Sequence, residues 1–314
     1  MPHLSPKISS FPKSVTIKVN EKTLEKMKKF YDSQMVPYDH PEVLFHAEMI
    51  GCRIFALKNM EVVFEGIRAY EASVHWVKEP KVKAKKVVSD KDESGVFIQK
   101  HIGSDDVGNS DYFGPICTVA CYVSEDDIQW LKTLDIPTEV KTLPATEIVR
   151  LAKIIKERVI YSLLILDNPH YNKMISEGIN NAHLKAKLHN QAITNIMQRL
   201  NFPVATKVIE QFVASKTYYN YLKNEVIVVK DLTFEKNSYE TYYAMICAHI
   251  LARYASLQYF NNMSRSLKVK LPYGSTSAAD QIAIKLVQQF GENILNKVAK
   301  KNMNNTKRVL EAIK

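Results

Sequence analysis

The chain has 314 residues, 46% of them hydrophobic and 24% charged, which is typical of a globular protein with about two domains. No apolar run approaches the roughly 18–20 residues that a membrane-spanning helix needs, and the first residues lack the apolar segment of a signal peptide, so we expect a cytoplasmic protein. The net charge of +10 favours a polyanionic partner, while four cysteines without a C-x-x-C pair argue against a structural zinc site or a disulfide framework.

Residues 1–77 are expected to form a small α+β domain on a curved antiparallel sheet. A helix is predicted behind Asn20, which can cap it, because Leu24, Met27 and Tyr31 recur at helical spacing. Strands are predicted at 15–19, 43–47, 52–57 and 61–64, and a short helix at 69–76.

A basic linker is expected at 78–94, where Lys, Asp, Glu and Ser dominate. The second domain, 95–314, begins with strands and then alternates strands with helices, which favours a mixed α/β sheet with helices on its faces. Strands are predicted at 96–104, 116–123, 159–166, 206–213 and 226–234, and helices at 144–157, 179–200, 238–262, 277–290 and 292–312. Lysine runs in the linker and near the C-terminus strengthen the expectation of a nucleic-acid partner.

The most informative stretch is 103–115, Gly-Ser-Asp-Asp-Val-Gly-Asn-Ser-Asp-Tyr-Phe-Gly-Pro, which joins two apolar runs. Its adjacent carboxylates, Asp105 and Asp106, are expected to lie close together and repel each other unless they bind a divalent cation. A polar hairpin loop is the alternative for an Asp-Asp pair alone. The whole string resembles the active-site strand of bacterial ribonuclease HIII, usually G-S-D-E-V-G-T-G-D-Y-F-G-P, at ten of its thirteen positions.

Further fragments extend this resemblance over most of the chain. Ile54–Gly66 is similar to the family's N-terminal domain, which itself resembles half of TATA-binding protein. The resemblance implies a ribonuclease H-like mixed sheet with flanking helices, preceded by a small TATA-binding-protein-like α+β domain. The later fragments follow in the family's order, at Tyr171-Asn172, Asn180–Asn190, Gln211-Phe212, Ala252–Tyr254, Leu271–Gly274 and Asn305-Thr306.

The resemblance also implies a chemistry, hydrolysis of the RNA strand of RNA/DNA hybrids with Mg²⁺ or Mn²⁺. Two metal ions held by four carboxylates would activate the attacking water and stabilise the leaving oxygen. Asp105 matches the first of these, Asp106 is one methylene shorter than the family's Glu, and Glu210 is one methylene longer than its Asp. These three residues are the expected metal ligands.

The fourth carboxylate of the family falls on Tyr239. Its neighbour Glu240 is therefore an uncertain fourth catalytic residue, because adjacent residues on a helix point about 100° apart. It could serve only if the helix began one residue out of register.

Substrate contacts are implied by the same resemblance. The family's G-T-G segment, which lies against ribose 2′-hydroxyls, becomes Gly108, Asn109 and Ser110. The other expected substrate-binding residues are Tyr112, Lys141 and, in the first domain, Lys58.

Several departures from the family leave two hypotheses open. Met60 stands where a turn glycine is expected, Glu61 and Tyr273 replace lysines, and Asn302 replaces a histidine. The protein is either a divergent, monomeric ribonuclease HIII or a catalytically decayed homologue that acts as a nucleic-acid-binding or protein-interaction scaffold. On the helix predicted at 179–200, a solvated basic face is favoured over a histidine metal site for His183, Lys185, Lys187 and His189.

Overall fold

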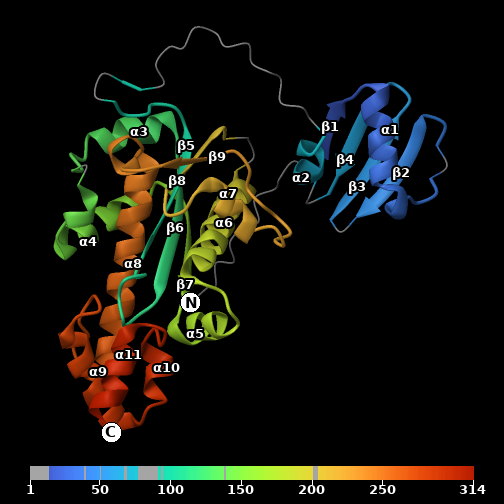
Figure 1. The fold of residues 1–314 in the computed structure, drawn as a ribbon. Helices are drawn as coiled ribbons and strands as arrows, with labels where there is room; N and C mark the ends of the chain where they lie inside the picture. Colours follow the sequence, from blue (N-terminus) through green and yellow to red (C-terminus); the bar gives the residue numbers. More distant parts are fainter. Residues whose placement is uncertain are drawn as a thin grey trace, which may run out of the picture. The chain divides into compact units, whose positions relative to one another are not determined.

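The computed structural model describes residues 14–38, 40–49, 51–66, 69–76, 91–92, 95–137, 139–200 and 204–314 (Figure 1). The chain divides into two compact units, one of residues 1–88 with 198–203 and one of residues 89–197 with 204–314. Most of the expected linker, including its lysine run, lies outside the described residues. None of the helices in the described ranges has both the length and the apolar character that crossing a membrane requires.

The first unit is a four-stranded antiparallel sheet with strand order β1-β4-β3-β2. Asn20 caps its main helix as expected, since the Asn20 side chain accepts a hydrogen bond of 2.9 Å from the Thr23 N–H. Met27 from this helix and Ile54 and Phe64 from the sheet are fully buried together in one core. The elements are β1 (Ser14–Lys18), α1 (Glu21–Phe30), η1 (Asp32–Gln34), β2 (Val43–Met49), β3 (Cys52–Leu57), β4 (Glu61–Glu65) and α2 (Ala69–Val74).

The turn between β3 and β4 contains Lys58, a predicted substrate contact, and Met60, which stands where a glycine is expected. Met60 has a φ of +65°, so a side chain occupies a left-handed position that favours glycine. Lys58, in the same turn, is exposed. It is accessible to a ligand.

The second unit is built on a five-stranded mixed sheet with strand order β7-β6-β5-β8-β9. The central strand β5 is antiparallel to β6 and parallel to β8. Its Gly103 lets a helix approach closely, because a Cβ there would lie 2.6 Å from the Met245 backbone nitrogen. The strands are β5 (His101–Val107), β6 (Ile116–Val123), β7 (Ile160–Leu166), β8 (Thr206–Glu210) and β9 (Leu232–Glu235).

Helix α8 (Tyr243–Leu267) is the central helix of this unit and packs along β5 and β6 (Figure 1). Every residue from Ala244 to Ala252 is buried, as expected of a helix covered on all sides. The remaining helices are α3 (Glu125–Lys132), α4 (Ala145–Ile155), α5 (Asn168–Ser176), α6 (Asn181–Arg199), α7 (Ser215–Tyr221), α9 (Ser277–Phe290), α10 (Ile294–Val298) and α11 (Asn304–Ala312), with 3₁₀ turns η2 (Val140–Thr142) and η3 (Ser238–Glu240).

Some predicted boundaries are wrong. The helix predicted at 292–312 is two helices, because Ala299 is extended and bridges Phe113. The helix predicted from 238 begins at Tyr243, after a 3₁₀ turn and the extended residue Tyr242. The acidic run after Ser124 forms α3, with a capping box between Ser124 and Asp127 that was not predicted.

Candidate active site

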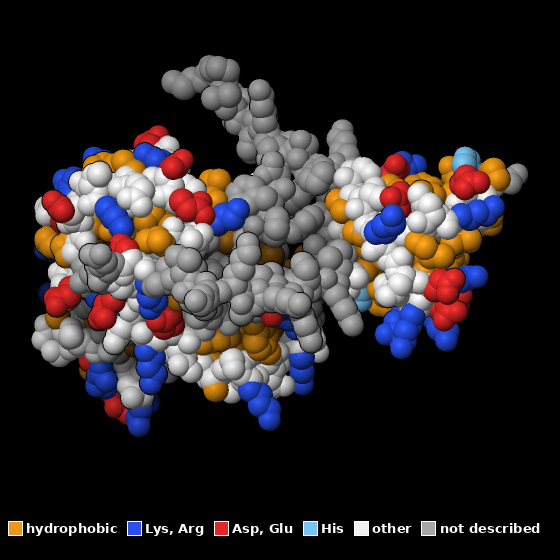
Figure 2. All heavy atoms as spheres, turned by 90° about the horizontal axis from the view of Figure 1, so that it is seen from above, with side chains coloured by type: hydrophobic (Ala, Val, Ile, Leu, Met, Phe, Trp, Pro, Cys, Tyr) orange, Lys and Arg blue, Asp and Glu red, His pale blue; other side chains and the backbone are white. Residues whose placement is uncertain are grey.

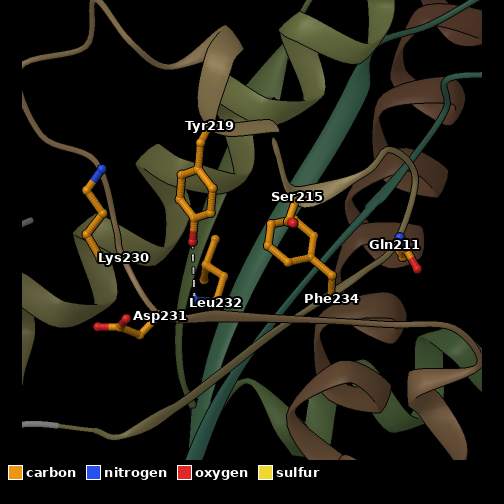
Figure 3. A pocket seen from close by; sticks show the side chains of 7 residues that line it. All are labelled: Gln211, Ser215, Tyr219, Lys230, Asp231, Leu232 and Phe234. Carbon is orange, nitrogen blue, oxygen red and sulfur yellow. Dashed lines mark hydrogen bonds between the residues drawn. The ribbon is translucent and has the colours of Figure 1, made fainter. Parts of the chain in front are cut away.

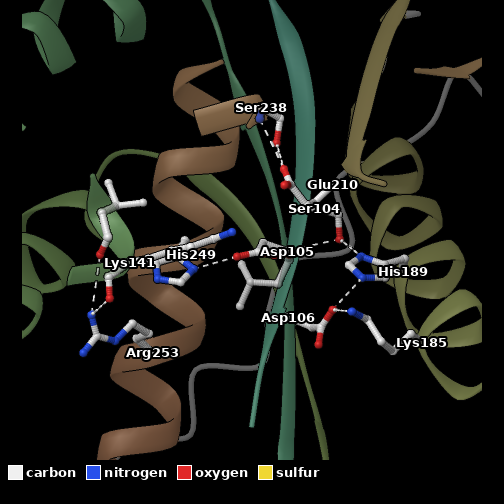
Figure 4. Close-up of polar contacts among 12 residues, drawn as sticks. Ser104, Asp105, Asp106, Lys141, Lys185, His189, Glu210, Ser238, His249 and Arg253 are labelled. Carbon is white, nitrogen blue, oxygen red and sulfur yellow. Dashed lines mark hydrogen bonds and ion pairs between the residues drawn. The ribbon is translucent and has the colours of Figure 1, made fainter. Parts of the chain in front are cut away.

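Asp105 and Asp106 lie side by side in sequence on β5, but their side chains leave opposite faces of the sheet (Figure 4). The expectation that they lie close together is wrong. The strand stays regular through Val107, pairing Asp105 with Val119 and Asp106 with Thr118. Successive side chains on a strand alternate between faces. Asp105 therefore faces α8, and Asp106 faces α6.

On the α8 face, Asp105 is only 5% exposed, and its Oδ2 lies 2.7 Å from Nδ1 of His249. Tyr239 lies beside this pair, with its ring edge-on to the His249 ring at a centroid distance of 5.5 Å. Burial, together with the neighbouring Asp105 carboxylate, raises the pKa of Tyr239 above its ordinary value, so the phenol stays protonated. The Lys141 ammonium lies 4.7 Å from the Tyr239 ring centroid.

Glu210, at the end of β8, belongs to the same face. Its Oε2 accepts hydrogen bonds of 2.5 Å from the Ser238 hydroxyl and 3.2 Å from the Ser238 N–H, and its Oε1 accepts one of 3.2 Å from the Asn237 N–H. The Glu210 charge also contributes to the raised pKa of Tyr239. Asp105 and Glu210 are thus both close enough to the Tyr239 phenol to raise its pKa.

Tyr239, rather than Glu240, faces Asp105. Tyr239 is buried within η3, whereas the Glu240 side chain is exposed. Within the described part of the chain, no hydrogen bond or ion pair joins Glu240 to another side chain. The structure therefore does not bring Glu240 to the other predicted catalytic residues.

On the α6 face, Asp106 is held by two cationic or polar groups. Its Oδ1 lies 2.8 Å from the Lys185 ammonium and 3.1 Å from Nε2 of His189 (Figure 4). Burial alone would raise the pKa of Asp106, but the His189 hydrogen bond and the Lys185 charge outweigh it, and the pKa is lowered. The expectation of a solvated face is wrong for Lys185 and His189, because Asp106 draws both side chains inward.

Ser104 and His189 continue this contact network without forming a nucleophilic site. The Ser104 hydroxyl lies 2.8 Å from Nδ1 of His189 and donates to the Val119 carbonyl at 3.0 Å. Ser104 is fully buried, so no substrate can reach it. The network fixes Asp106 to α6.

The predicted substrate-reading loop begins at Gly108, which has a φ of +95°. A Cβ there would lie 2.2 Å from the Pro115 carbonyl oxygen, so the position requires glycine. Asn109 is half-buried and Ser110 is exposed. Lys141 is also exposed on η2, so the Ser110 and Lys141 side chains are accessible to a substrate, whereas the Asn109 Oδ1 is buried.

The prediction that Tyr112 contacts the substrate is wrong. Its side chain is 0% exposed, and its hydroxyl lies 3.0 Å from the Thr306 hydroxyl. It therefore anchors the loop rather than touching a ligand. Lys300 anchors the same loop by donating to the carbonyls of Asp111 at 2.9 Å and Gly114 at 2.6 Å.

A pocket of about 630 Å³ opens next to Glu210, beyond the end of β8. The Tyr219 and Phe234 rings line it, and the Lys230 ammonium is 5.3 Å from the Tyr219 ring centroid (Figure 3). Asp105 does not line this pocket. Its lining residues are Gln211, Ser215, Tyr219, Lys230, Asp231, Leu232 and Phe234.

The predicted carboxylates differ in how well they are placed to bind a divalent cation. Within the described ranges, no three His, Cys, Asp or Glu side chains are grouped so that all could bind one metal ion. Mg²⁺, however, is usually bound through one or two carboxylates, with waters and substrate phosphates completing its shell. The carboxylates of Asp105 and Glu210, on one face of the sheet, fit that kind of site. Asp106 lies on the other face and is already paired.

The five-stranded mixed sheet with a buried aspartate on its central strand defines a ribonuclease H-like protein. Consistently, residues 102–306 match the family model of ribonuclease HII, and residues 14–89 match a domain of unknown function (DUF3378). The ribonuclease HIII of Listeria monocytogenes serotype 4b is 34% identical over 307 residues, covering 96% of this chain and 99% of that protein. That of Bacillus cereus is 33% identical over 312 residues, with the same coverage.

Among solved structures, Bst-RNase HIII in complex with Mn²⁺ has a TM-score of 0.68 and 26% identity, covering 96% of this chain and 99% of that one. The chain belongs to the ribonuclease HIII family. The family and the fold that the resemblance of 103–115 and the further fragments implied are therefore confirmed. The alternative of a decayed scaffold gains no support from these relatives, which are named as ribonucleases.

The sequence alone did not reveal His249. The only signal was a histidine within the apolar stretch 243–252. Nor did it reveal the pairing of Asp106 with Lys185 and His189. The available signal was that Lys185 and His189 are four residues apart on one helix and so share a face.

Proposed function

We propose that this protein is an endoribonuclease that hydrolyses the RNA strand of RNA/DNA hybrids with the aid of Mg²⁺ or Mn²⁺. The observation that carries the proposal is the buried Asp105 on the central strand, within a string that matches the active-site strand of the family. The protein is expected to act as a monomer in the cytoplasm.

Asp105 and Glu210 are proposed to hold the cation, since both present hard carboxylate oxygens on the α8 face. A cation held there would supply activation of the attacking water and stabilisation of the charge on the leaving oxygen. The Ser238 hydroxyl and two backbone N–H groups orient Glu210. Asp106 stays a predicted ligand, and it would have to leave Lys185 and His189 to reach the cation.

We propose that Tyr239 alters this site relative to a four-carboxylate set. A protonated phenol next to Asp105 removes one negative charge from the surroundings of the cation. Weaker metal binding is therefore expected. Glu240 would regain a role only through a shift of η3 by one residue.

The substrate is proposed to lie along the loop at Gly108, Asn109 and Ser110, with Lys141 contacting phosphate. Backbone groups of such a loop can distinguish ribose from deoxyribose by contact with the 2′-hydroxyl. Residues 1–77 are proposed to bind the duplex, with Lys58 as a phosphate contact, and 78–94 to link them to the catalytic domain at 95–314. Glu61 would weaken that binding.

The test is cleavage of an end-labelled RNA/DNA hybrid compared with duplex DNA and duplex RNA of the same sequence. The RNA strand of the hybrid should be cut in the presence of Mg²⁺ or Mn²⁺ and left intact with a chelator. A hybrid that stays intact with excess of either metal would contradict the proposal. Binding of the intact hybrid, weakened by salt, would then support the scaffold alternative.

A further inference from the structure

We propose that His249 is a positioning residue, which holds the Asp105 carboxylate in the orientation that a divalent cation needs. The inference rests on the proposed function, because it assigns Asp105 to the cation. His249 lies on the buried half of α8, and its Nδ1 is 2.7 Å from Oδ2 of Asp105 (Figure 4). Only Oδ2 takes part in this contact.

Within the described part of the chain, Asp105 is the one hydrogen-bond partner of the His249 ring. Its Nε2 is buried and has no hydrogen-bond partner among the residues that the structure describes. A buried polar ring is costly unless it is hydrogen-bonded, so the Nδ1 contact is the one that compensates for its burial. An ionised carboxylate can only accept, so Nδ1–H is the donor.

The His249 ring is itself fixed in place. Tyr239 packs against it edge-on, with ring planes at 77°, and both residues are buried. Rotation of His249 away from Asp105 would thus require Tyr239 to move. The two rings pack together next to the Asp105 carboxylate.

Groups that orient a metal-binding carboxylate act through the geometry of the ligand, and their loss typically costs 10–100-fold in metal affinity. Without the His249 donor, the buried Asp105 carboxylate would lose the contact that orients its Oδ2, and Tyr239 would remain as its neighbour. The expected effect is therefore on cation affinity rather than on substrate contacts.

The experiment compares three variants of the full chain, His249→Asn, His249→Gln and His249→Leu, by titration with Mn²⁺ alone, followed through the electron paramagnetic resonance of free Mn²⁺. The Asn Nδ2 amide is bonded to Cγ, as His Nδ1 is, so it can restore the donor, whereas the Gln amide lies one bond farther out. His249→Asn should bind Mn²⁺ within about threefold of the unchanged protein, and His249→Gln and His249→Leu should lose about 10–100-fold.

His183→Leu is the matched control, because the His183 ring stacks on Tyr221 at 4.9 Å, outside the contacts of Asp105. Equal Mn²⁺ affinity in all three His249 variants would overturn the proposal, as would a chain that binds no Mn²⁺ at all. If His249→Leu does not fold, the comparison of His249→Asn with His249→Gln decides alone. Failure of hybrid cleavage, with Mn²⁺ binding still dependent on the Nδ1 donor, would overturn the proposed function but support the positioning role.

Discussion

The Lys185 ammonium lies 2.8 Å from Oδ1 of Asp106, on the face of β5 opposite to Asp105. This ion pair separates the roles of two aspartates that are adjacent in sequence. One carboxylate is matched by a cation from the protein itself, and the other faces a histidine and a phenol. Asp106 is thus paired within the protein, whereas Asp105 is the carboxylate that we propose to hold the cation.

The ion pair predicts a large cost for Lys185→Met. The side chains are 18% and 5% exposed, and breaking a buried pair from one side typically costs about 3–5 kcal/mol. Because Asp106 keeps its contact with His189, the loss should lie near the lower end of that range. Urea unfolding of Lys185→Met should show a loss in that range, and adding Asp106→Leu should recover most of it.

The control for this prediction is Lys307→Met. Its partner Glu311 lies 3.9 Å away, and the two side chains are 79% and 60% exposed. Exposed pairs contribute about 0–1 kcal/mol, so this variant should unfold like the unchanged chain. Equal losses in the two lysine variants would contradict the assignment of Lys185.

His101 predicts a pH dependence of stability. Its Nδ1–H donates to the Gln99 carbonyl at 2.8 Å and its Nε2 accepts from the Ala244 N–H at 3.1 Å, so the folded protein requires the neutral ring. Burial lowers the pKa of His101 from 6.5 to about 4. A histidine with a lowered folded pKa contributes full stability above pH 6.5, which is lost as the pH falls towards 4.

The shift in the His101 pKa sets the largest loss in the free energy of unfolding. This loss is on the order of 3 kcal/mol, since one pKa unit is about 1.4 kcal/mol. Urea unfolding between pH 7.5 and 4.5 should show a steeper decline for the unchanged chain than for His101→Gln, which does not titrate. The variant itself should be less stable at pH 7.5. Parallel pH profiles would refute this role for His101.

Gly108→Ala should impair both folding and cleavage. The new Cβ would meet the Pro115 oxygen at 2.2 Å in addition to requiring a φ of +95°. Gly178→Ala is the matched control, since Gly178 has a φ of +86° but nothing within 4 Å of the added atom. In urea unfolding, the free energy of unfolding of the control should fall by about 1 kcal/mol from backbone strain alone. That of Gly108→Ala should fall by clearly more. Similar losses would show that the close approach to Pro115 is not needed.

Tyr239→Glu tests the proposed alteration of the site. A third carboxylate beside Asp105 and Glu210 would repel both, so the metal-free variant should melt below the unchanged chain. Binding of a cation to the folded state should reverse this, giving a larger rise in Tm with Mg²⁺ than in the unchanged chain. Tyr239→Phe should show no such gain. Equal Mg²⁺ responses in both variants would argue that position 239 does not face the cation.

Local patterns predicted much of the fold. The cap at Asn20 and the strands at 52–57 and 116–123 lie where the residues place them, because caps and β-rich runs act over short distances. The split at Ala299 could not be read in the same way, since it depends on a bridge to Phe113, which is distant in sequence.

The second unit also mixes acidic and basic side chains on the face in Figure 2, so charge runs alone do not define a binding surface.

The candidate site was predictable only in part. The resemblance identified Asp105, Glu210 and the anomaly at Tyr239, because motif positions carry over from relatives. It could not give the face that each side chain takes, which depends on β5 remaining a regular strand through Val107. His249 lies 144 residues from Asp105 along the chain, so only the packing of α8 on β5 reveals their contact.

The most direct test of the central claim is the rate of hybrid cleavage by Asp105→Asn beside the matched control Asp126→Asn, which changes an exposed aspartate on α3. Asn at position 105 keeps the shape of the side chain but removes the charge that the cation needs. We predict that the unchanged chain and Asp126→Asn cleave the RNA strand at similar rates with saturating Mn²⁺, and that Asp105→Asn is slower by at least about 100-fold. Cleavage by Asp105→Asn at the rate of the control would contradict the account.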